Sequence, residues 1–351
     1  MNRQQMMGGI LVAAGLSLAS GADAATPKCS LVRLDEWSVR PGSHHPIVEG
    51  SANGQPIGIM LDTGAVRSVI LPSAARRLDL PRREARNYRM FGIGGETPVE
   101  VAQVATFSIG PTVRKGMHLI VAGARELAPG IDVILGDDFF HNVDVEFDLP
   151  HGAVRLFQAK DCAGVSLAYW TTEEAGEVAI EAVHDAEPQI VVPVKINGRQ
   201  MRALVDSGAA SSFMTKNAAA AAGLAPDSPG VVSAGQGRGL GPKSVDTWIG
   251  PIDTFTIGNE NIRDTAILFS DLFKDATYAE AGSRVSRQIG GIEDMILGLD
   301  FLRSHRVLIA HSQRKLYFSY IGGTVFQPRS KLSPPGTSSP ERAVAPPAGG
   351  G

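Results

Sequence analysis

Two apolar runs of the chain each end in a carboxylate and a turn of small residues. They are residues 59–65 (IMLDTGA) and residues 203–209 (ALVDSGA). An apolar run of this length that ends at glycine predicts a buried strand. A charge on a buried strand must be paired or protonated, because an isolated carboxylate is costly in apolar surroundings. Two carboxylates that face each other meet this need by sharing a proton, so we expect Asp62 and Asp206 to form a pair.

The two runs belong to an internal repeat that covers most of the chain. Asp62 and Asp206 stand 144 residues apart, and several small and apolar residues after them match at the same offset. Further on, residues 133–140 (VILGDDFF) align with residues 295–302 (MILGLDFL) at an offset of 162 residues. The second copy therefore holds 18 additional residues. We place them in a surface loop within the polar stretch 271–291.

The pattern between these motifs predicts the same β-rich order of elements in both copies. A hairpin leads into each Asp-bearing strand, a short helix follows, and strands of alternating polarity come next. We therefore predict an all-β fold with two small barrel-like lobes, residues 29–162 and 175–326. Short helices are expected at 72–78, at 216–222 and after each Ile-Leu-Gly motif, with Asp138 or Asp300 in the first turn, where the helix dipole favours an acid.

A glycine-rich hairpin is expected after each of the first two short helices. The first copy has Phe91, Gly92, Ile93, Gly94 and Gly95, with the hairpin continuing to Glu96. The second copy has Gly235, Gln236, Gly237 and Arg238, with the hairpin continuing to Leu240. The first of these clusters also suggests a dinucleotide-binding loop, but such a loop must open a helix. Residues 97–101 (TPVEV) predict an extended strand, so we favour the hairpin.

The two ends of the chain differ in composition from its middle. Residues 1–24 combine Arg3, an apolar stretch too short to span a bilayer and the small-residue site Ala22-Asp23-Ala24, which predicts a cleaved signal peptide. A retained membrane anchor is the alternative; no other apolar run is long enough to span a membrane. Residues 328–351 are rich in Pro, Ser, Gly and Ala and predict a disordered tail.

Composition limits the partners of the chain. Its 351 residues are 43% hydrophobic, and the formal net charge is −3 at pH 7. This length allows two domains with sizeable cores. The chain has no long basic run that would indicate nucleic acid or an anionic membrane surface as a partner.

The chain has two cysteines, Cys29 and Cys162. A signal peptide predicts a periplasmic or secreted protein, and in that oxidising setting an even pair forms a disulfide more often than a metal site. We expect Cys29 and Cys162 to be bonded; two buried, unpaired thiols are the alternative.

A run of acids in the first copy raises the question of calcium. Asp144, Glu146 and Asp148 lack the Gly and the terminal Glu of the known calcium loop. Their alternation along a strand is expected to turn all three to one solvated face. We therefore predict no metal site.

The order of the motifs resembles that of the aspartic proteases, specifically their retropepsin-like branch. A strand with Asp-Thr/Ser-Gly-Ala, a glycine-rich hairpin and an apolar-Ile-Leu-Gly segment follow one another, twice over nearly the whole mature chain. The resemblance implies two tandem retropepsin-like lobes in a pseudo-twofold, pepsin-like arrangement. It also implies an exported aspartic endopeptidase that acts on peptides or proteins without a cofactor. Both halves of the site lie on one chain, so a monomer is expected.

The resemblance implies a role for each residue of the two motifs. Asp62 and Asp206 would be the catalytic pair, and the glycine-rich hairpins would be flaps over the substrate. Thr63 and Ser207 would brace the two loops through their hydroxyl groups. The other loop residues are Gly64 and Gly208, which would permit the tight turn, and Ala65 and Ala209, which have no hydroxyl group to donate to a carboxylate. The alternative function is a peptide- or protein-binding module that keeps the cleft without useful turnover.

Overall fold

Each half of the chain folds into a closed six-stranded β-barrel. The computed structural model describes residues 28–123, 127–181, 189–271, 277–279, 286–288 and 293–332. The first barrel runs in the order β2 (Ile47–Ala52), β3 (Gln55–Leu61), β8 (Val133–Leu135), β4 (Val69–Ile70), β7 (Thr112–Val121) and β6 (Gly95–Ile109), and closes where β6 pairs with β2. Strand β5 (Arg82–Gly92) extends it beside β6.

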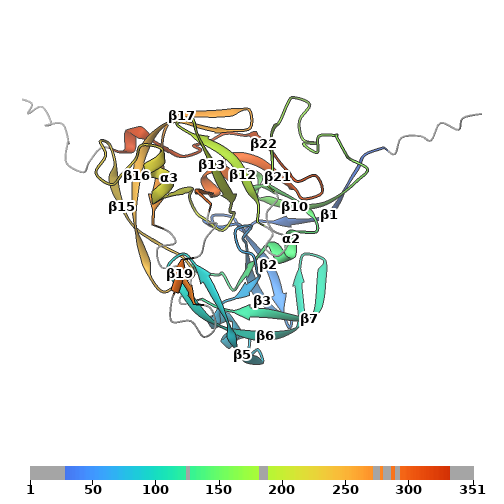
Figure 1. Ribbon diagram of the computed structural model, residues 1–351. Helices are drawn as coiled ribbons and strands as arrows, with labels where there is room; N and C mark the ends of the chain where they lie inside the picture. The colour runs from blue at the N-terminus through green and yellow to red at the C-terminus, as the bar shows by residue number, and fades with distance from the viewer. Residues whose placement is uncertain are drawn as a thin grey trace, which may run out of the picture.

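The second barrel repeats this order. It runs through β12 (Val191–Ile196), β13 (Arg199–Val205), β20 (Met295–Leu297), β14 (Phe213–Thr215), β17 (Glu260–Ser270) and β16 (Ser244–Ile257), and closes where β16 pairs with β12. Strand β15 (Val232–Arg238) extends it beside β16. Figure 1 shows the first barrel, in blue to teal, below the second, in yellow-green to orange. The prediction of two all-β lobes related by an internal repeat is confirmed.

Four short α-helices lie where the sequence predicts them. Helix α1 (Pro72–Arg77) begins with a proline, whose fixed φ suits the first turn. Helix α3 (Lys216–Ala221) begins after Thr215, whose hydroxyl accepts a hydrogen bond from the Ala218 amide. Helices α2 (Asp137–Phe140) and α4 (Leu299–Leu302) each follow the glycine of an Ile-Leu-Gly motif.

One six-stranded sheet joins the two lobes. Its order is β1 (Ser30–Ser38), β10 (Ala153–Lys160), β9 (Asp144–Asp148), β21 (His305–Ala310), β22 (Lys315–Tyr320) and β11 (Gly176–Ala179). The lobes meet where β9 pairs with β21, with Val145 opposite Ile309 and Phe147 opposite Val307. The apolar side chains of this junction belong to a core cluster that runs through both halves of the chain, so the lobes share one hydrophobic core.

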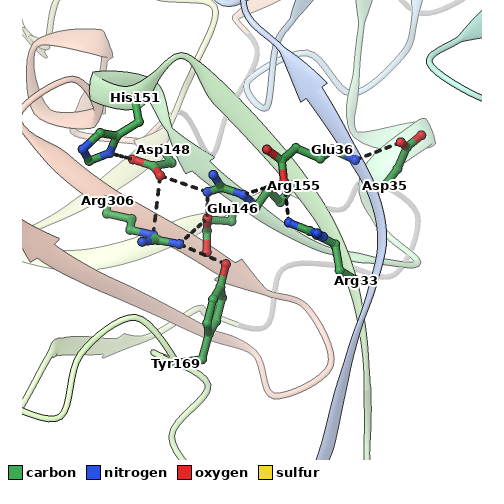
Figure 2. Close-up of polar contacts among 9 residues, drawn as sticks. All are labelled: Arg33, Asp35, Glu36, Glu146, Asp148, His151, Arg155, Tyr169 and Arg306. Carbon is green, nitrogen blue, oxygen red and sulfur yellow. Dashed lines mark hydrogen bonds and ion pairs between the residues drawn. The ribbon is translucent and has the colours of Figure 1, made fainter.

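The polar face of this sheet is buried, so the prediction of a solvated acidic face is wrong. Asp144, Glu146 and Asp148 are at most 2% exposed. Glu146 lies between two arginines, accepting from Arg155 Nη1 at 2.5 Å and from Arg306 Nη2 at 3.0 Å (Figure 2). The strand alternation was correct, but paired cations and the segment that carries Tyr169 and Trp170 cover the face.

The ends of the described chain are tied down by covalent and tertiary contacts. Cys29 and Cys162 form a disulfide, as the sequence predicts. At the other end, β23 (Gln327–Pro328) pairs with β17, and the 3-10 helix η2 (Arg329–Leu332) follows. The C-terminal lobe therefore continues beyond residue 326. The Thr265 hydroxyl holds this segment by donating a hydrogen bond to the Gln327 carbonyl. The predicted start of the tail at 328 is too early.

Several predictions concern residues outside the described ranges. They are the signal peptide at 1–24, the tail beyond residue 332 and most of the loop 271–291. Within that loop, β18 (Thr277–Ala279) and β19 (Ser286–Gln288) form a two-stranded sheet. No helix in the described part of the chain is both long and apolar enough to cross a membrane.

Candidate active site

Asp62 and Asp206 stand at the ends of matching strands in the two barrels. Strand β3 runs parallel to β8, and the amide of Asp62 donates to the Leu135 carbonyl at 2.9 Å. Strand β13 runs parallel to β20 in the same way, and the amide of Asp206 donates to the Leu297 carbonyl at 2.9 Å. The Ile-Leu-Gly segment is therefore the strand that fixes each Asp backbone.

Each carboxylate is held by the backbone of its own turn. Asp62 Oδ1 accepts from the amides of Gly64 (3.0 Å) and Ala65 (3.1 Å). Asp206 Oδ1 accepts from the amides of Gly208 (2.8 Å) and Ala209 (3.0 Å). Two amide donors to one oxygen orient the carboxylate and stabilise its charged form.

The two carboxylates lie against each other and against the opposite glycine. Their side chains share a hydrogen bond. A β-carbon added at Gly64 would lie 2.7 Å from Asp206 Oδ1, and one added at Gly208 would lie 2.5 Å from Asp62 Oδ1. Neither glycine has a left-handed φ. Glycine is therefore required at both positions because a side chain there would overlap the carboxylate of the other lobe. The backbone conformation of the turn, which was the expected reason, does not by itself require glycine.

The surroundings raise the pKa of both carboxyl groups above the ordinary value. Both side chains remain partly accessible to solvent, but the protein around them excludes enough water that burial is the largest cause of each shift. For Asp62 the charge of Asp206 raises the pKa further, whereas the backbone amides oppose the shift at both residues. Two like charges this close cannot both persist, so the pair holds one proton over the intermediate pH range.

A reciprocal set of four buried hydrogen bonds locks the two turns together. The Ser207 hydroxyl accepts from the Thr63 amide at 3.0 Å and donates to the Leu61 carbonyl at 2.9 Å. The Thr63 hydroxyl accepts from the Ser207 amide at 3.0 Å and donates to the Val205 carbonyl at 2.7 Å. All four bonds cross between the lobes, so they fix the separation of Asp62 and Asp206.

A second pair of contacts lies behind each turn, and the sequence did not predict which groups form them. The Ser68 hydroxyl donates to Asp138 at 2.6 Å and accepts from the Gly136 amide at 3.0 Å. Ser212, Asp300 and Gly298 make the same set of contacts in the other lobe. The repeat held the signal, because a serine six residues after each Asp and an acid two residues after each Ile-Leu-Gly glycine recur in both copies. Asp138 and Asp300 stand in the first turns of α2 and α4, as predicted, and they also anchor the Asp-bearing turns through the two serines.

The two glycine-rich hairpins meet tip to tip. The Gly241 amide donates to the Ile93 carbonyl and the Lys243 amide donates to the Gly94 carbonyl, each at 3.0 Å. Gly92 and Gly95 form the last backbone pair of the first hairpin, next to the pair of Phe91 with Glu96. Ile93 packs on the second lobe beside Val245 and Ile296, and Leu240 packs on the first.

The second hairpin differs from the sequence prediction in where its tip lies. The predicted residues Gly235, Gln236, Gly237 and Arg238 are paired within β15 and β16. The segment that reaches the first hairpin is 239–243, of which the prediction included Gly239 and Leu240 but not residues 241–243. Among the described residues, no group of three or more His, Cys, Asp or Glu side chains is arranged to hold a metal ion.

A family model matches both halves of this geometry. The model is described as aspartyl protease and matches residues 48–139 and 192–301, together more than half of the chain. Each matched region contains one Asp-bearing turn and one Ile-Leu-Gly segment. No curated protein matches the chain at a significant level.

Proposed function

The chain belongs to the retropepsin-like aspartyl proteases, and from that premise we propose that it is an endopeptidase whose catalytic pair is Asp62 and Asp206. The observation that carries the proposal is the paired geometry itself. Two carboxyl groups from two lobes share a hydrogen bond, each turn is locked to the other, and the pKa of both groups is raised. Such a pair holds the single proton that acid–base catalysis needs.

The proposed reaction uses one water molecule and these two carboxyl groups. The ionised carboxylate takes a proton from the water, whose oxygen attacks the carbonyl carbon of the scissile bond. The protonated carboxyl group donates to the carbonyl oxygen, which gives a neutral tetrahedral diol. Collapse of the diol breaks the C–N bond, and a proton passes to the leaving amine. The pair then holds one proton again, so the cycle closes without a cofactor.

The contact between the hairpin tips supports the role of flaps. Two backbone hydrogen bonds join the tips, so an extended peptide that spans both lobes requires the tips to separate first. We propose that Phe91, Gly92, Ile93, Gly94 and Gly95 on the first hairpin and residues 235–243 on the second cover such a peptide. Peptides and proteins are therefore the proposed substrates.

The proposed setting is periplasmic or secreted, and the proposed active form is a monomer. The disulfide between Cys29 and Cys162 supports an oxidising compartment. The shared core and the joining sheet support a monomer, because one chain supplies both halves of the site. Light scattering of the mature protein tests this proposal, and an obligate dimer that loses activity on dilution would contradict it.

The deciding experiment for the activity is a peptide-library digest with Asp62→Asn and Asp206→Asn. We expect each variant to lose nearly all cleavage while its unfolding transition remains, because neither carboxyl group can take both roles. Asp264→Asn is the control, since that carboxylate is largely exposed. Stoichiometric binding of a pepstatin-type inhibitor by a wild-type protein that cleaves no peptide would favour the binding module instead.

A further inference from the structure

A buried carboxylate that accepts no hydrogen bond from the described residues lies behind the turn that carries Asp62. Asp137 is the first residue of α2, and its amide donates to the Ala65 carbonyl at 2.8 Å. The residue is 1% exposed, and neither carboxylate oxygen has a hydrogen-bond partner among the described residues. Because an unpaired buried charge is costly, the protonation state of this group has consequences for stability.

A histidine from the other lobe faces this carboxylate. His311 follows β21, and its Nε2 lies 4.0 Å from Asp137 Oδ1. This nitrogen also lacks a hydrogen-bond partner within the described part of the chain. The next residue, Ser312, donates from its amide (2.8 Å) and from its hydroxyl (2.6 Å) to Asp144 of the first lobe. The turn is therefore anchored across the junction and keeps His311 beside Asp137.

The internal repeat provides a comparison within the same molecule. At the offset of 162 residues, Asp137 corresponds to Leu299 and His311 corresponds to Leu149. Leu299 is buried in the hydrophobic core, and the partly buried Leu149 packs against it. The two positions thus hold polar, titratable side chains in one copy of the repeat and apolar side chains in the other.

The surroundings shift the two groups in opposite directions. Burial raises the pKa of Asp137 to about 6, with a smaller rise from Asp138 and an opposing effect from His141. Burial, together with His141, lowers the pKa of His311 to about 4. Two other charged groups belong to the same region. Asp144 accepts hydrogen bonds from Ser312, and the Arg114 guanidinium lies over the Phe139 ring of α2. Between the two values both groups are neutral, so the carboxylic acid has a proton and the imidazole has a free acceptor.

We propose that Asp137 and His311 form a proton-sharing latch between the two lobes, closed while the pair holds one proton. In that state the Asp137 hydroxyl donates to His311 Nε2 after a small side-chain movement that closes the 4.0 Å gap. Loss of the proton leaves a buried carboxylate, and gain of a second leaves a buried imidazolium. Either charge weakens the junction at which Asp137 also holds the Ala65 carbonyl. The inference stands apart from the proposed activity, because it concerns stability.

The direction of the effect differs for the two groups. The pKa of Asp137 is higher in the folded than in the unfolded protein, so its contribution is present in acid and is lost as the pH rises through about 6. The pKa of His311 is lower in the folded protein, so its contribution is present above pH 6.5 and is lost as the pH falls through about 4. In the wild-type protein the two trends oppose each other between pH 4 and 6 and largely cancel, so the free energy of unfolding changes little across that range.

Replacing one residue of the pair should reveal how the other residue alone makes the unfolding equilibrium depend on pH. In His311→Leu, the unfolding equilibrium constant should rise on the order of 100-fold between pH 4 and pH 7, beyond any wild-type change. In Asp137→Leu, it should rise on the order of 100-fold as the pH falls from 7 to 4. The double variant installs the leucine pair of the other lobe and should lose both trends.

Chemical unfolding at a series of pH values measures these constants, with the exposed His118→Leu as the control. If a leucine variant does not fold, Asp137→Asn and His311→Gln remove the titration and keep the polarity, and the same opposite trends apply. Amide exchange at Val145 and Phe147, which pair with β21, reports opening of the junction directly. Opposite pH trends in the single variants, absent from the double variant, would establish the latch. Single variants that follow the wild-type pH profile would overturn it.

Discussion

The hydroxyl of Ser207 is the group whose loss should damage both the fold and the site. Ser207→Ala removes the acceptor of the Thr63 amide and the donor to the Leu61 carbonyl. All three residues are at most 2% exposed. Water therefore does not replace the lost partners, and the variant leaves two buried backbone groups unpaired.

The expected cost follows from these two groups. An unsatisfied buried backbone group costs about 1–3 kcal/mol, so Ser207→Ala should lower the free energy of unfolding by roughly 2–6 kcal/mol. The same bonds set the separation of Asp62 and Asp206. A misplacement of about 1 Å costs on the order of 100-fold in rate, so kcat/KM should fall by at least that factor in the folded variant.

Urea unfolding and peptide cleavage measured on the same samples test this prediction. Thr63→Ser is the matched control, because it keeps the hydroxyl and installs the residue of the second copy; it should stay within about 1 kcal/mol of wild type. Thr63→Val removes the reciprocal hydroxyl and should resemble Ser207→Ala. A stability loss below about 0.5 kcal/mol for Ser207→Ala would refute the view that these four bonds hold the lobes in register.

Three further changes test the geometry of the site. Gly208→Ala places a methyl group against the Asp62 carboxylate and should reduce kcat/KM on the order of 100-fold; normal turnover would contradict the packing. The raised pKa values of the pair predict a bell-shaped kcat/KM profile, shifted to higher pH than two carboxyl groups with ordinary pKa values would give. Ala65→Ser adds a donor that favours the charged form, so the acidic limb should move to lower pH by about one unit or less; an upward shift would refute this. The side chain introduced by Gly241→Val overlaps the backbone of Gly94, so the variant should raise KM while the unfolding transition stays unchanged. An unchanged KM would show that the contact between the hairpin tips does not affect substrate binding.

The sequence determined those features that depend on local pattern and on the repeat. Asp62 and Asp206 were identifiable because an apolar run that ends in a carboxylate is costly unless the carboxylate is paired, and because the same run occurs twice. The hairpins, the short helices and the order of elements along each copy follow from periodicity and turn residues, which act over a few positions. The disulfide was predictable because the chain has two cysteines.

Tertiary structure alone decided what lies against each surface. Alternation shows that Glu146 shares a face with its neighbours, but the cover over that face comes from Arg306, which is 160 residues away in the chain. Gly64 and Gly208 carry no sign of the opposite carboxylate, because the contact forms only when the lobes close around one axis. The facing of Asp137 and His311 likewise depends on the junction between lobes. Periodicity records which residues point the same way, whereas burial and pKa depend on groups that long-range folding brings within a few ångströms.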